Sequence, residues 1–83
     1  MKTKDLISLQ LEIYEKSYEK TKDLKEFKTN IYKTILEIEE ITPVSPFHSS
    51  YLFQIKLDCE NVTQSNALTT SQSLKNFLER LNQ

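Results

Sequence analysis

The sequence contains no glycine among its 83 residues. Phosphate-binding loops and tight hairpin turns use glycine, because its backbone reaches conformations that a Cβ atom forbids. A chain without glycine is therefore poorly suited to nucleotide binding or to an all-β fold. We expect helices that are joined by short polar or proline turns.

Cysteine and histidine occur once each, as Cys59 and His48. A single cysteine excludes an internal disulfide and is typical of a reducing compartment, so we expect a cytoplasmic protein. A metal site needs at least three ligands, which this pair does not supply. We predict no cofactor, no metal and no enzyme activity, with Cys59 in the core. The remaining catalytic alternative is a nucleophile and base formed by Cys59 and His48.

Neither sign of charge is in excess, because 11 Lys and Arg residues stand against 12 Asp and Glu residues. No basic stripe is present, so we do not expect nucleic acid as a partner.

Long apolar runs are also lacking: no stretch approaches the roughly 20 residues of a membrane-spanning helix, and the first ten residues do not resemble a signal peptide. We expect a single small helical domain over residues 1–83, without a membrane span.

Apolar residues recur at helical spacing through the first half of the chain. One stripe is formed by Leu6, Leu9 and Ile13, and a second run extends from Leu24 to Ile38. Asp23 followed by Glu26 matches a capping box at which a second helix would begin. However, no glycine or proline interrupts residues 3–41, and we favour one continuous helix there over two.

The only two prolines, Pro43 and Pro46, lie close together in TPVSPF. Each disfavours helical angles at the residue before it, so a helix should end near Ile41 and residues 42–47 should form a hinge. The acidic cluster Glu37, Glu39 and Glu40 precedes this hinge. Negative charge near a helix C-terminus opposes the helix dipole, which indicates that a basic surface of a partner docks there.

Residues 51–59 fit two templates. Phe53, Ile55 and Leu57 alternate with polar residues as in a strand, whereas Leu52, Ile55 and Cys59 lie on one arc of a helix. We favour the helix, because the chain offers no second strand for pairing. A last short amphipathic helix is predicted around Leu74 to Leu81, with Ser71 or Thr70 as its N-cap.

The predicted fold is therefore all-α. It is a helical hairpin or a small three- to four-helix bundle with a proline hinge at 42–47, and a dimer is a further expectation. The alternative is an α+β fold with one strand at 51–59.

The segment YEKSYEKT, residues 14–21, places two tyrosines one helical turn apart, in line with two earlier aliphatic residues. This makes a second apolar stripe beside the first one. Together the stripes cover about half of the helix circumference, which is wider than the face that a small domain buries. The candidate interface is Ile7, Leu11, Tyr14 and Tyr18. The alternative is that the tyrosines complete the core with their hydroxyls at its rim.

Two classes of function remain. The first is a non-enzymatic helical protein that binds another protein as an inhibitor, immunity factor, chaperone or regulator. The second is a self-assembling structural subunit, for example of a secretion apparatus, in which identical copies cover the surplus apolar surface. The outline of a helix, a proline turn and a second helix is similar to needle subunits and small chaperones of secretion systems and to small helical immunity proteins. The expected partner is thus another protein or a second copy, as in a homodimer.

Overall fold

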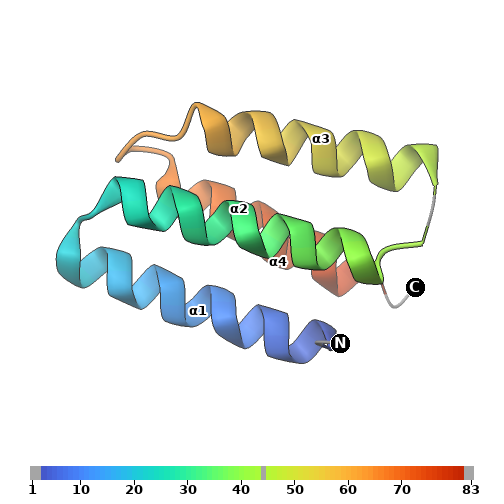
Figure 1. Cartoon of the computed structure of the whole chain (residues 1–83), viewed down its shortest axis with the longest axis horizontal. Coiled ribbons are helices and arrows are strands. Elements are labelled where there is room, and N and C mark those ends of the chain that lie inside the picture. Colours follow the sequence, from blue (N-terminus) through green and yellow to red (C-terminus); the bar gives the residue numbers. More distant parts are fainter. Residues whose placement is uncertain (1–2, 44, 82–83) are drawn as a thin grey trace.

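The computed structural model describes residues 3–43 and 45–81, which form four α-helices. They are α1 (Lys4–Thr21), α2 (Leu24–Ile41), α3 (Pro46–Glu60) and α4 (Ala67–Arg80). Successive helices run in opposite directions, and α4 lies behind α2 (Figure 1). Helices α1 and α3 each pack against both α2 and α4, and α2 also touches α4 across the bundle. The prediction of a small all-α bundle is confirmed.

A turn separates α1 from α2, so the continuous helix over residues 3–41 that we favoured is wrong. Lys22 adopts a left-handed conformation with φ 58°, and its N–H donates to the Tyr18 carbonyl at 2.7 Å. Asp23 then caps α2, because its carboxylate accepts from the Glu26 N–H at 3.1 Å. A left-handed residue other than glycine costs about 1–2 kcal/mol, and the packing of two helices side by side offsets this cost.

The second turn lies where the two prolines predict it. Helix α2 ends at Ile41, and Pro46 occupies the first turn of α3, where its missing N–H would have no helical partner in any case. That this turn acts as a hinge stays a prediction.

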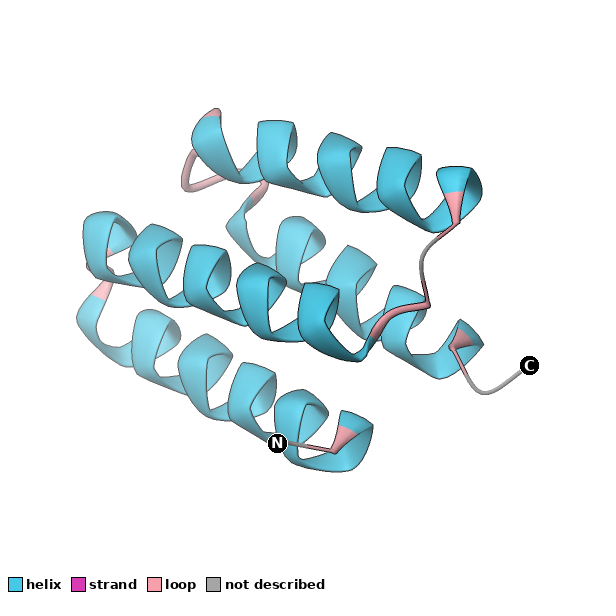
Figure 2. Cartoon of the chain, turned by 45° about the vertical axis from the view of Figure 1, so that its right-hand side comes forward, coloured by secondary structure: helices cyan, strands magenta, loops and turns pink. Residues whose placement is uncertain are grey.

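Residues 51–59 lie within α3, and the described residues contain no strand (Figure 2). The helical arc of Leu52, Ile55 and Cys59 is buried, as the favoured interpretation requires, whereas Phe53 is exposed. The α+β alternative is therefore wrong.

Helix α4 begins earlier than its apolar residues indicated. Asn66 precedes it, and the Asn66 carbonyl accepts from both the N–H and the hydroxyl of Thr70. The predicted caps, Ser71 and Thr70, are instead buried inside the helix. The start is displaced because Ala67, too small to mark an apolar run in the sequence, already packs in the core.

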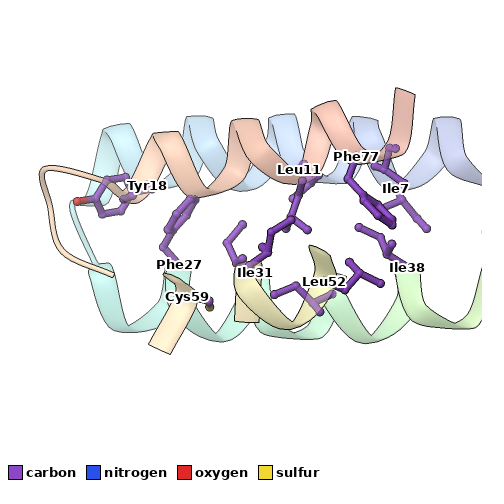
Figure 3. Close-up of a cluster of buried hydrophobic side chains, with 14 residues drawn as sticks. Ile7, Leu11, Tyr18, Phe27, Ile31, Ile38, Leu52, Cys59 and Phe77 are labelled. Atoms are coloured by element: carbon purple, nitrogen blue, oxygen red, sulfur yellow. The ribbon is translucent and has the colours of Figure 1, made fainter. Parts of the chain in front are cut away.

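The core runs along the centre of the bundle and draws on all four helices (Figure 3). At one end, the Tyr18 and Phe27 rings meet across the α1–α2 turn with their centroids 4.8 Å apart. Buried hydroxyls are bonded within their own helices, as Thr34 is to the Asn30 carbonyl at 2.9 Å. Ser71 differs: its Oγ is fully buried and finds no partner among the described residues.

We expect Ser71→Ala to raise the free energy of unfolding by about 1 kcal/mol, because it removes an unsatisfied buried hydroxyl and adds helix propensity. The matched control is Ser73→Ala, two residues further along α4, whose hydroxyl donates to the Thr69 carbonyl at 3.1 Å. The control should change stability by less than about 0.5 kcal/mol, since the lost bond offsets the propensity gain. Urea unfolding followed by circular dichroism measures both, and a destabilised Ser71→Ala would contradict the prediction.

Candidate functional site

The predicted interface residues of α1 lie on its inward face. Ile7 and Leu11 are completely buried, Tyr18 is buried, and Tyr14 is half-buried against the core. The folded chain uses them to hold α1 to the bundle, in line with the alternative that the tyrosines complete the core, and their role as an interface stays a prediction. This stripe is buried rather than the other one because it continues to the α1–α2 turn, where the Tyr18 ring packs against the Phe27 ring.

The outward apolar surface of α1 is formed by its other stripe. Leu6, Leu9 and Ile13, called the α1 stripe below, are 54, 54 and 58 % exposed. Their spacing of three and four is that of a coiled-coil seam. In the next turns the stripe is followed by Lys16 and Lys20, so it covers only half of the helix.

Polar contacts on both flanks of α1 fix the direction of this stripe. On one side, the Gln10 amide donates to Thr34 Oγ1 and to Glu37 Oε2 of α2, each at 3.4 Å. On the other side, Glu15 forms a partly buried ion pair with Lys75 of α4. Since both neighbouring helices are engaged in this way, α1 cannot rotate to bury the stripe without breaking these contacts.

A second apolar surface lies over α2 and α3. It consists of Tyr32 and Leu36 on α2 with Phe53 and Leu57 on α3, all exposed, and it is called the α2–α3 face below. Phe53 is the most exposed of them, at 61 %. Two adjacent helices thus each expose two large apolar side chains, and exposed apolar surface is a candidate for contact with another chain.

Two open hollows lie between α2 and α3. One, of about 470 Å³, is bordered by Tyr32, Cys59 and three lysines, Lys25, Lys28 and Lys33. The other, of about 350 Å³, is bordered by Phe53 and by Lys56, which pairs with Glu39 at 2.8 Å. The first hollow is also bordered by Glu60, so its rim carries charges of both signs with lysines in the majority.

Cys59 and His48 do not form a catalytic pair. They are 11 positions apart in α3, which corresponds to about 16 Å along a helix. Cys59 is buried, and its thiol donates to the Lys28 carbonyl at 3.5 Å. Burial raises the pKa of the Cys59 thiol above its ordinary value of 9.0, although the Lys28 charge acts in the opposite direction. The His48 ring lies edge-on between Phe47 and Phe77. The buried thiol and the histidine ring are too far apart to act together as a nucleophile and its base.

Within residues 3–43 and 45–81, no three His, Cys, Asp or Glu side chains gather closely enough to hold a metal ion. Over the same residues, none of the helices combines the length and the apolar character needed to cross a bilayer.

The raised pKa of Cys59 predicts a pH dependence of stability. Above about pH 9 the thiol ionises more readily in the unfolded chain than in the folded one, so its contribution to stability is complete below pH 9 and is lost as the pH rises. Cys59→Ala should be less stable than the wild type by about 1–2 kcal/mol at pH 7, because it leaves a small cavity. Urea unfolding of both proteins between pH 7 and about pH 10.5 should show this gap narrowing. A constant gap would contradict the prediction.

The chain was compared with protein-family models, with curated proteins and with solved structures, and none of the three comparisons finds a match.

Proposed function

We propose that this chain is a non-enzymatic helical protein that acts by binding another protein chain, with the α1 stripe at the centre of the contact. The observation that carries the proposal is the exposure of Leu6, Leu9 and Ile13 on a helix that is fixed on both flanks. A partner helix that covers a seam of this spacing packs its side chains between those of α1.

The energetics of apolar exposure support this proposal. Covering one large aliphatic side chain is worth about 1.5–3 kcal/mol relative to leaving it in water. The three residues of the α1 stripe are contiguous, and Tyr32, Leu36 and Phe53 add a second surface of the same kind. Contact surfaces with this character bind through a few apolar anchors surrounded by a polar rim.

The surroundings of Cys59 and His48 favour a binding function over catalysis. Burial favours the neutral thiol of Cys59, which donates a hydrogen bond to the backbone carbonyl of Lys28. We place the protein in the cytoplasm, where a lone cysteine stays reduced, and we expect the role of an inhibitor, immunity factor, chaperone or regulator.

The second candidate is the self-assembling subunit, in which the bound partner is an identical chain. One observation favours it: the chain itself exposes large apolar side chains on α2 and α3 as well as the α1 stripe.

The proposal predicts that a triple variant, Leu6→Gln, Leu9→Gln and Ile13→Gln, keeps its helicity and loses its partner. Glutamine is a good helix former and the three sites are exposed, so folding should be unaffected. Tagged wild type, the triple variant and the control Leu68→Gln, an exposed leucine on α4, are each used to capture proteins from a lysate that also contains untagged chain. Each protein retained by wild type and control but lost from the triple variant is then purified.

Isothermal titration gives the dissociation constant of the purified partner. We expect the triple variant to bind at least about 30-fold more weakly than the wild type, since it loses most of three apolar anchors. Equal binding by the wild type and the triple variant, with both folded by circular dichroism, would contradict the proposal.

A further inference from the structure

One of the two hollows between α2 and α3 combines apolar walls with an excess of positive charge. This hollow, called the lysine hollow below, is bordered by Lys25, Lys28, Thr29, Tyr32, Lys33, Cys59 and Glu60. Its volume of about 470 Å³ lies within the range of about 300–1,000 Å³ that is typical of small-ligand sites. Tyr32 and Cys59 give it apolar walls, and the methylene stems of the lysines extend these walls towards the solvent. The lysine hollow can therefore cover one flat apolar group.

The lysines on its rim have donors that the chain does not use. Lys28 donates to the Glu60 backbone carbonyl at 3.0 Å, and an ammonium group has further protons for another acceptor. Within residues 3–43 and 45–81, the ammonium groups of Lys25 and Lys33 make no hydrogen bond or ion pair. Three lysines against one glutamate leave a surplus of positive charge around the lysine hollow.

The other acidic residues of this region face elsewhere or are already paired. Asp23 and Glu26 border a separate hollow between α1 and α2. Glu39 pairs with Lys56 at 2.8 Å, and at 100° per residue Asp58 lies on the flank of α3 opposite to Lys56. Among the described residues, the one carboxylate that borders the lysine hollow is thus that of Glu60.

We propose that the lysine hollow binds a small organic anion, in which an aromatic or aliphatic group carries one carboxylate. The apolar group lies against Tyr32 and Cys59, and the carboxylate accepts charge-assisted hydrogen bonds from the lysines of the rim. Burial favours the neutral thiol of Cys59, so the wall adds no negative charge that would repel this ligand.

The size of the lysine hollow favours a small molecule over a protein as its ligand. A protein contact of ordinary size uses about 20–30 residues on each side, whereas seven residues border this hollow. The site also lies apart from the α1 stripe, so it is an addition to the proposed protein contact and does not depend on it.

Naphthalene-2-carboxylate and its neutral counterpart, naphthalene-2-carboxamide, form a matched pair of probes. Titration of each into ¹⁵N-labelled wild type, followed through backbone amide chemical shifts in NMR, gives both the affinity and the place of binding. We expect shifts centred on residues 25–33 and 57–60, with a Kd of about 1 mM or tighter for the carboxylate. The carboxamide should bind about three- to tenfold more weakly at low salt, because it lacks the attraction to the lysines. Sodium chloride at about 0.5 M should narrow this difference.

Two double variants with the same net charge locate the charge effect. The rim variant, Lys25→Gln with Lys33→Gln, removes two ammonium groups from the lysine hollow, whereas the control, Lys16→Gln with Lys20→Gln, removes two exposed ones from α1. The rim variant should bind the carboxylate about as weakly as the carboxamide, and the control should bind both probes like the wild type. Tyr32→Ser should weaken both probes alike, since the ring contributes apolar contact and no charge. Circular dichroism checks that each variant is folded.

Three outcomes would overturn the proposal. The first is equal affinity of the wild type for the carboxylate and the carboxamide at low salt. The second is a set of shifts centred on the α1 stripe, as unspecific contact with exposed apolar surface would give. The third is the absence of shifts with about 10 mM carboxylate, as expected if only a larger partner covers this hollow. Each of them leaves the capture experiment on the α1 stripe, and with it the proposed function, unaffected.

Discussion

The contact between Tyr18 and Phe27 across the α1–α2 turn decides which face of α1 is buried, and the rest of the structure depends on that choice. Once Tyr18 is packed there, Tyr14, Leu11 and Ile7 follow it inward at helical spacing. The other stripe of α1 is then left facing water. The Gln10 and Glu15 contacts with α2 and α4 hold this orientation from both flanks. The exposed surface of the protein is thus a consequence of how its first two helices are joined.

Much of the fold could be predicted because it rests on local signals. The two prolines end α2 and open α3, and the helical arc of Leu52, Ile55 and Cys59 separates a helix from a strand. The α1–α2 turn was not the favoured prediction, although Asp23 and Glu26 match a capping box that indicates the start of a second helix there. Position 22 is lysine rather than glycine, so the local helix propensity favours one continuous helix. The free energy gained by packing two helices side by side outweighs this preference.

The identity of the outward surface could not be predicted from periodicity alone. The two stripes of α1 have similar apolar content and lie on neighbouring faces of the helix. Only the packing of α1 against the other helices decides which stripe is buried. A signal was nevertheless present. The stripe through Ile7, Leu11 and Tyr18 extends over almost the whole helix, whereas the other gives way to Lys16 and Lys20 after Ile13. A longer continuous stripe buries more apolar surface, and that difference favours it as the core.

Small size links the exposed surface to stability. A chain of 83 residues buries a smaller fraction of its surface than a larger domain does, and its core already contains an unpaired hydroxyl at Ser71. A partner that binds only the folded form adds stability in proportion to the logarithm of its concentration. Under the proposed function, the apolar residues that face water in the isolated chain would stabilise it when a partner covers them. The exposure of Leu6, Leu9 and Ile13 then costs little in the bound state, where the partner removes them from water.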